Sequence, residues 1–334
     1  MNSNKMFFFF ILIFSTFISI SANSWMGCWI GLEINLLSFI PLISNSKNLF
    51  SSEASLKYFL VQSIASINFL FSILLKMIMF KNFEINNLFS ILINSSMFMK
   101  MGSAPFHFWF PNIIEGMSWM NCFILMSWQK ITPMILMSYY LNNNFLMLIM
   151  MINTIIGAIG GINQTSLRKL MSFSSINNLG WMMLAIMISE SLWFTYFFFY
   201  SFLMSIMCFL FYIMNIYFIN QLFIFNMNFL LKFIIDLMNS LSMGSITTFF
   251  SICPKMILTY FHNFSYILNI FLSYLFYWVT TLFFYYRIIY SRVFFFFSKK
   301  KSFKIFLKNK FFSFFMFFGV IFIMGKFLSA FFFF

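Results

Sequence analysis

Acidic residues are almost absent from this sequence: Asp and Glu together number six in 334 residues, and all charged residues make up 8%. Hydrophobic residues make up 62%, and the mean hydropathy is +0.93. A soluble domain of this length carries many more charges on its surface, so the composition excludes the soluble classes. It indicates an all-α polytopic membrane protein, because helices satisfy their own backbone hydrogen bonds in lipid.

Residues that bind metals or form disulfides are also scarce. The sequence has no C-x-x-C pair and no Gly-rich phosphate loop, and its two histidines, His107 and His262, lack metal-ligand spacing. We therefore expect no disulfide framework, metal site or cofactor site in this chain. The net charge of +14 does not indicate a nucleic-acid partner, because the basic residues flank apolar runs. The four cysteines stand singly at Cys28, Cys122, Cys208 and Cys253.

Apolar runs of about 20 residues, the length that crosses a bilayer, fill most of the chain. The first run could pass for a signal peptide, but so many further runs follow that a transmembrane helix is the better interpretation. The eleven predicted spans are 6–22, 25–43, 55–80, 86–107, 119–140, 145–163, 167–188, 192–218, 237–262, 265–290 and 311–333.

The distribution of Lys and Arg predicts the orientation of these spans. Fourteen of the 20 basic residues fall in or beside loops on the N-terminal side, two lie on the opposite side, and four lie within spans. Basic loops stay on the cytoplasm-equivalent side of a membrane. Enrichment in Phe, Met, Ile, Asn and Lys is typical of an AT-rich organellar genome. In a mitochondrial protein, that side would be the matrix. An odd number of spans places the C-terminus opposite, in the intermembrane space.

Three lysines within the spans are candidate functional residues. A lysine at the bilayer centre costs about 2.5–3.5 kcal/mol on insertion scales, so such residues usually have a function. Proline supplies no N–H and frees the carbonyl four residues earlier, which favours a hydrated pocket beside each amine. The three pairs are Lys100 with Pro105, Lys130 with Pro133, and Lys255 with Pro254.

Two further ionisable residues fall at membrane depth. Glu33 lies in the middle of span 25–43, either paired with a lysine of a neighbouring helix or protonated and hydrogen-bonded in the core. His107 follows Lys100 by about two helical turns, but Pro105 intervenes, and a structural histidine fits as well as a proton carrier. Lys76 and Lys326 lie near span ends, where their amines can reach the interface without a functional role.

Four motifs carry a resemblance to a known family: Trp29–Pro41, Lys100–Pro111, Trp128–Pro133 and Gly160–Ile176. They resemble the mitochondrial NADH dehydrogenase subunit 2 family, the antiporter-like membrane subunits of respiratory complex I. The resemblance is strong over residues 25–184 and rests mainly on span pattern beyond them. Animal members have lost three N-terminal helices, which leaves the eleven counted here.

The resemblance implies a fold of two inverted five-helix repeats plus a C-terminal helix. The first repeat would cover 1–140 and the second 145–290, followed by a basic matrix-side loop at 291–310 and the last helix at 311–334. Family members usually have prolines before the last lysine, whereas this chain has Thr247 and Thr248. A threonine bends a helix less than proline does, so a broken helix near Lys255 is left open.

The resemblance also implies the function. Glu33, Lys100, Lys130 and Lys255, with His107 as a weaker candidate, would take part in proton translocation across the inner mitochondrial membrane, coupled to NADH oxidation by ubiquinone. The chain would be catalytic only as a subunit of NADH:ubiquinone reductase. Other subunits would bind NADH, FMN, iron–sulfur clusters and ubiquinone. Its partners would be membrane-arm subunits and lipids, with cardiolipin as a candidate.

Two alternatives remain at this point. The chain could be a free-standing cation/proton antiporter with the same fold, which would purify without redox partners. It could also be a structural membrane subunit without its own proton path, in which case the buried lysines would be replaceable by methionine. The direction and stoichiometry of proton transfer do not follow from the sequence.

Overall fold

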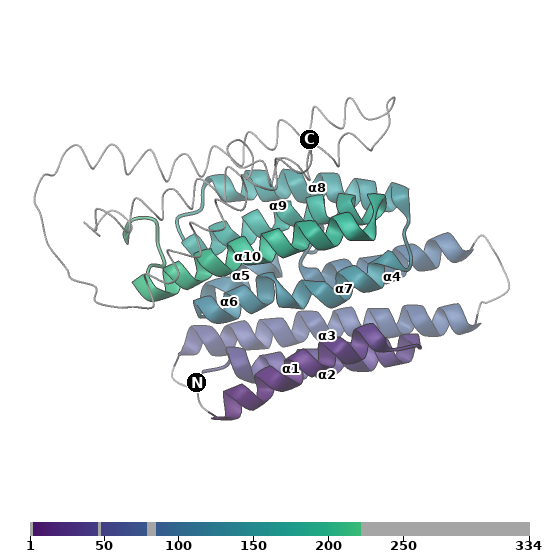
Figure 1. The fold of residues 1–334 in the computed structure, drawn as a ribbon, viewed down its shortest axis with the longest axis horizontal. Helices are drawn as coiled ribbons and strands as arrows, with labels where there is room; N and C mark the ends of the chain where they lie inside the picture. Colours follow the sequence, from purple (N-terminus) through teal and green to yellow (C-terminus); the bar gives the residue numbers. More distant parts are fainter. Residues whose placement is uncertain (1–2, 46–47, 79–84, 222–334) are drawn as a thin grey trace, which may run out of the picture.

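A computed structural model describes residues 3–45, 48–78 and 85–221 of the chain. This part forms a bundle of helices that run roughly along one common direction (Figure 1). The predicted spans at 237–262, 265–290 and 311–333, the basic loop at 291–310 and Lys255 lie outside the described residues. Within the described ranges the helices are α1 Ser3–Ser21, α2 Trp25–Ile43, α3 Leu49–Ile78, α4 Ile85–Met101, α5 Trp109–Gly116, α6 Trp119–Met126, α7 Trp128–Ser138, α8 Asn143–Ile162, α9 Leu167–Ile188 and α10 Glu190–Met214.

Six of these helices, namely α1, α2, α3, α8, α9 and α10, are long and apolar enough to cross a membrane. They coincide with six predicted spans. The bounds of α2 and α9 agree with the predicted 25–43 and 167–188, whereas α3 begins at Leu49 rather than at 55. The prediction of an all-helical membrane protein is therefore confirmed for the described part of the chain.

The other two predicted spans in this part are interrupted. Span 86–107 contains α4, which ends at Met101, and a non-helical segment that leads into α5. Span 119–140 contains α6 and α7, which meet at Ser127. Helix α5 is not among the predicted spans, and its eight residues are too short to cross a membrane. Interrupted helices of this kind form the central sites of many transporters.

The end of α4 is fixed by a glycine. Gly102 has a φ of +70°, and the N–H groups of Gly102 and Ser103 donate to the carbonyls of Met99 and Phe98. This pair of bonds is the Schellman arrangement, which closes a helix through a left-handed residue. A side chain at Gly102 would also meet Phe110, since an added Cβ would lie 2.9 Å from its Cβ. The helix therefore ends before Pro105 is reached.

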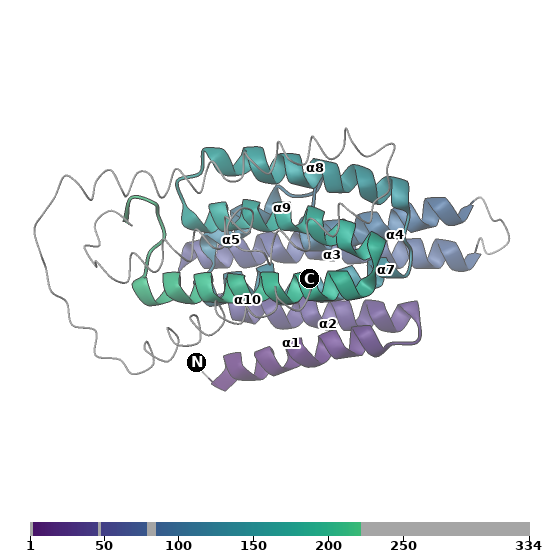
Figure 2. The same ribbon diagram turned by 45° about the horizontal axis from the view of Figure 1, so that its top comes forward.

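In the view of Figure 1 the helices form three groups: α1–α3 lie on one side, α8–α10 on the other, and α4–α7 between them. In the turned view of Figure 2, α8 and α1 lie at opposite edges of the bundle. Contacts of α3 with α4 and α5, of α5 with α9, and of α6 with α10 join the groups. Small residues bring α8 and α9 together. An added Cβ on Gly157 would lie 2.7 Å from the backbone nitrogen of Asn177.

The basic residues Lys5, Arg168 and Lys169 lie near one end of the bundle. Lys5 Nζ lies 3.4 Å from the carbonyl oxygen of Leu42, at the end of α2. At the start of α9, Lys169 forms a 2.7 Å ion pair with Glu115, and Arg168 donates to the Glu115 carbonyl. The same carbonyl of Leu42 accepts a 2.8 Å hydrogen bond from Asn121, near the start of α6. These residues therefore share one end of the bundle, as the distribution of Lys and Arg along the sequence predicts.

Candidate functional site

Lys100 lies next to the end of α4, inside the bundle. Only 7% of its surface is exposed. The Gln62 side chain of α3 donates a 2.9 Å hydrogen bond to the Lys100 carbonyl, one of the carbonyls left without a helical partner where α4 ends. No hydrogen bond from Lys100 Nζ to another described residue is formed within normal distance. A buried amine with this much unused donor capacity needs water or a movable partner.

A small cavity lies beside Lys100. The volume open to the centre of a water molecule is about 10 Å³, so the cavity has room for roughly one water molecule. Polar groups from three other helices share its lining. Gln129 of α7 donates a 2.9 Å hydrogen bond to the side-chain oxygen of Asn35 in α2. The Thr132 hydroxyl is buried and has no hydrogen-bond partner among the described residues. The lining residues are Leu32, Asn35, Leu36, Tyr58, Gln62, Lys100, Gln129, Thr132 and Pro133.

Lys130 lies in the first turn of α7 and is 1% exposed. Its amine has two hydrogen-bond partners, the Ser175 carbonyl of α9 at 3.3 Å and the Tyr200 hydroxyl of α10 at 3.4 Å. The rings of Phe110 and Tyr200 lie 5.5 and 5.3 Å from Nζ, measured to their centres. Within the described residues, Lys130 forms no ion pair with a carboxylate. Neutral oxygens and aromatic faces therefore surround this lysine.

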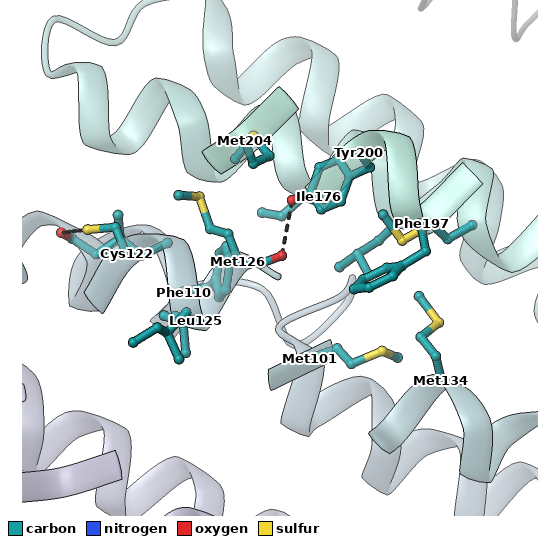
Figure 3. Packing of buried hydrophobic residues seen from close by; sticks show 14 of the residues in the cluster. Met101, Phe110, Cys122, Leu125, Met126, Met134, Ile176, Phe197, Tyr200 and Met204 are labelled. Atoms are coloured by element: carbon teal, nitrogen blue, oxygen red, sulfur yellow. Dashed lines mark hydrogen bonds between the residues drawn. The ribbon is translucent and has the colours of Figure 1, made fainter. Parts of the chain in front are cut away.

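The position of Lys130 depends on the junction between α6 and α7. The Ser127 hydroxyl donates a 2.6 Å hydrogen bond to the Phe123 carbonyl, a bond to the preceding turn that bends helices. The Lys130 N–H then bonds to the Ser127 carbonyl at 3.1 Å. The Met126 carbonyl instead accepts the Tyr200 hydroxyl at 3.1 Å, which Figure 3 shows as a dashed line. Pro133 lies inside α7, as the sequence predicts.

Glu33 is half-buried in the middle of α2. Its carboxylate has a charge–charge interaction with the amine of Lys100. The ion pairs in the described part of the chain are Lys57–Glu53 and Lys169–Glu115. A direct ion pair between Glu33 and a lysine, one of the two alternatives from the sequence, is not among them. The structure therefore brings Glu33 and Lys100 into one region without direct contact.

His107 lies apart from the cavity beside Lys100. Because α4 ends at Met101, no continuous helix carries His107 onto the face of Lys100. Its Nδ1 lies 3.3 Å from the carbonyl oxygen of Pro105. His107 lines a separate cavity of about 430 Å³, and Gln164 and Lys169 also line that cavity. Lys76 stands near the other end of the bundle, with its amine 4.0 Å from the ring centre of Tyr140.

Several residues that contact or enclose these lysines were not among the sequence-derived candidates, among them Asn35, Gln129, Ser175 and Tyr200. Asn35 and Gln129 lie within the motifs that carry the family resemblance, so their position in those motifs was an available signal. Ser175 contributes only its backbone carbonyl, which no residue type could have indicated. Tyr200 stands in an aromatic-rich run, Phe197–Tyr200, where its hydroxyl was the only distinguishing feature.

Comparison with known proteins agrees with this geometry. A family model described as NADH:quinone oxidoreductase/Mrp antiporter, transmembrane, matches residues 22–290. The NADH-ubiquinone oxidoreductase chain 2 of Anopheles gambiae is 49% identical over 252 residues, and that of Aedes aegypti is 50% identical over 257. Each match covers 74% of both chains.

Solved structures show the same fold at low identity. A chain of respiratory complex I from Thermus thermophilus, determined with bound aureothin, superposes with a TM-score of 0.74 at 16% identity. That match covers 86% of this chain and 70% of the other. A chain of the Mrp complex from a Dietzia species gives a TM-score of 0.69 at 12% identity, over 83% of this chain and 58% of the other. The chain therefore belongs to the membrane family shared by NADH:quinone oxidoreductases and Mrp antiporters.

Proposed function

We propose that this chain is a core membrane-arm subunit of respiratory complex I and takes part in proton translocation across the inner mitochondrial membrane. Translocation would be coupled to NADH oxidation by ubiquinone. The observation that carries the proposal is the pair of buried lysines, Lys100 and Lys130, each beside a break in a span and each without a direct carboxylate partner in the described part of the chain. Close identity to chains named NADH-ubiquinone oxidoreductase chain 2 supports the same assignment.

The chemistry of these lysines suits charge alternation. Burial disfavours an ammonium group, while hydrogen-bond acceptors and nearby negative charge favour it. Lys130 has two neutral acceptors, and Lys100 has Glu33 as a charged neighbour without direct contact. A change of charge on one of these residues therefore alters the preferred protonation state of the next residue in the series. Lys255, outside the described residues, would extend this series.

Energy from the redox reaction would reach this chain through neighbouring subunits. Moving one charge against the membrane potential costs about 2.3 kcal/mol per 100 mV, so the lysines must respond closely to that signal. We place NADH, FMN, the iron–sulfur clusters and ubiquinone on other subunits of the complex. We place the N-terminus in the matrix and the C-terminus in the intermembrane space, with membrane lipids, cardiolipin among them, around the helices.

A free-standing cation/proton antiporter is the second candidate, favoured by the structural likeness to the Mrp complex. Antibody capture of the native chain from detergent-solubilised inner membrane distinguishes the two. A complex I subunit would bring down rotenone-sensitive NADH:ubiquinone activity, which pumps protons after reconstitution into vesicles. Recovery of the chain alone or as a homo-oligomer, without NADH oxidation, would support the antiporter instead. A complex that pumps normally with both lysines replaced by methionine would indicate a structural subunit.

A further inference from the structure

We propose that the Tyr200 hydroxyl positions the Lys130 amine and reverses its hydrogen bond when the lysine changes charge. This proposal rests on the function proposed above, because it assumes that Lys130 alternates between ammonium and amine. Tyr200 lies in the middle of α10 and is 6% exposed. Its hydroxyl lies 3.1 Å from the Met126 carbonyl, a contact drawn in Figure 3. The same hydroxyl lies 3.4 Å from Lys130 Nζ.

The helix junction provides the partner for the hydroxyl. In a continuous helix the Met126 carbonyl would accept the N–H of the residue four positions later, which is Lys130. Here the Lys130 N–H donates to Ser127 instead. The Met126 carbonyl, buried at the end of α6, needs another donor, and Tyr200 supplies it. The hydroxyl therefore contacts both the backbone at the junction and the lysine that follows it.

Counting donors and acceptors gives the direction of each bond. An ammonium group has three N–H donors and no acceptor. With Lys130 charged, Tyr200 accepts from Nζ and donates its proton to Met126. The Ser175 carbonyl accepts a second N–H of the ammonium at 3.3 Å.

A neutral amine has a lone pair that requires a donor. A carbonyl cannot donate, so of the two groups that contact Nζ only the Tyr200 hydroxyl can fill this role. Rotation about its C–O bond turns the hydroxyl proton from Met126 towards Lys130, with no covalent bond broken and no proton transferred. The Met126 carbonyl then loses its donor, so the charge of Lys130 is linked to the α6–α7 junction.

The residue one turn earlier on α10 provides a matched control. Tyr196 is 7% exposed, and its hydroxyl donates a 2.9 Å hydrogen bond to the side chain of Asn178, a neutral amide. Tyr196→Phe and Tyr200→Phe both remove one buried hydroxyl from the same helix. They differ in whether that hydroxyl contacts a lysine.

The test compares Tyr200→Phe, Tyr196→Phe, Lys130→Met and the double variant Tyr200→Phe/Lys130→Met in the assembled complex, with assembly checked on a native gel. Loss of one hydrogen bond to a charged group predicts a coupled proton-pumping rate about tenfold lower in Tyr200→Phe. Tyr196→Phe is expected to pump near the parental rate. The double variant should pump no worse than Lys130→Met.

The contrary outcomes distinguish failure of this inference from failure of the proposed role of Lys130. Normal pumping by Tyr200→Phe beside an impaired Lys130→Met would overturn this inference and leave the proposed function intact. Normal pumping by an assembled Lys130→Met complex would reject the proposed role of Lys130 in proton translocation, and this inference with it. A further loss in the double variant would show that Tyr200 acts on the fold rather than through Lys130, and would also overturn the inference.

A second measurement applies if Tyr200→Phe fails to assemble. Infrared difference spectra between resting and turning-over complex, with isotope-labelled tyrosine, report changes in tyrosine hydrogen bonding. The proposal predicts a labelled tyrosine band that shifts in the parental complex and stays unchanged in Lys130→Met. Equal band shifts in the two complexes, or none in either, would overturn it.

Discussion

Gln129 of α7 donates a 2.9 Å hydrogen bond to the side-chain oxygen of Asn35 in α2. The bond joins the residue before Lys130 to the helix that carries Glu33. Both amides line the small cavity beside Lys100. The pair therefore connects the helices that carry Glu33 and Lys130, beside the cavity that Lys100 lines.

Breaking this amide pair should destabilise the chain. Gln129→Leu leaves the Asn35 oxygen, in a side chain only 3% exposed, without its donor. An unsatisfied buried polar group costs about 1–3 kcal/mol. Replacing both residues by leucine removes the unmatched partner, so Asn35→Leu/Gln129→Leu should withstand heat better than Gln129→Leu alone. The measurement is the loss of assembled complex on a native gel after graded heating. A double variant less stable than both single variants would contradict this account.

The close contact between α8 and α9 can be tested at Gly157. An added Cβ would lie 2.7 Å from both the Cβ and the backbone nitrogen of Asn177, and backbone cannot move aside easily. Overpacking of this kind costs about 1–3 kcal/mol. Gly157→Ala should therefore lower the yield and heat resistance of the assembled complex. Ile159→Ala, at a side chain 59% exposed on the same helix, is the control. Equal behaviour of the two variants would argue against tight packing here.

Orientation in the membrane can be tested with introduced cysteines. Asn48 lies in a loop on the predicted matrix side, and Asn144 lies at the start of α8 on the opposite side; both are exposed. The native cysteines of the described residues, Cys28, Cys122 and Cys208, are buried. An impermeant maleimide added to mitoplasts should label Asn144→Cys and should reach Asn48→Cys only after detergent. The reverse labelling pattern would invert the topology.

The interaction between Glu33 and Lys100 predicts non-additive variants. Glu33→Gln and Lys100→Met each remove the same charge–charge interaction, so the double variant should pump little worse than Lys100→Met. Since the two groups form no direct ion pair, Glu33→Gln should be the milder single change. The measurement is protons pumped per NADH oxidised in complexes of equal assembly. Additive losses would show that the two residues act separately.

Much of the fold follows from the sequence because hydropathy and length decide where a chain can cross a bilayer. The bounds of α2 and α9 agree with prediction for this reason. The predicted span 86–107 runs past Pro105, whereas α4 ends at Met101 because the left-handed Gly102 closes the helix. The α6–α7 junction depends on the Ser127 hydroxyl bonding to its own helix, a choice that composition does not fix.

The candidate site was predictable in part. Lys100 and Lys130 could be selected because a charge in lipid is costly and therefore noticeable in the sequence. The hydrogen-bond partners of these lysines could not be selected from the sequence, because a backbone carbonyl such as that of Ser175 is present in every residue type. The separation of Glu33 from Lys100 depends on how α2 and α4 pack, which spacing along the chain does not determine.

The most direct test of the account is proton pumping by Lys130→Met, with Lys76→Met as its control. Both variants remove one lysine from a membrane helix, but Lys130 is buried at the α6–α7 junction whereas Lys76 is half-exposed near the end of α3. Protons pumped per NADH oxidised are measured in reconstituted vesicles that contain fully assembled complex. The account predicts a strong loss of coupled NADH:ubiquinone activity and pumping for Lys130→Met and near-normal values for Lys76→Met. Normal pumping by an assembled Lys130→Met complex would contradict the role of this lysine in proton translocation.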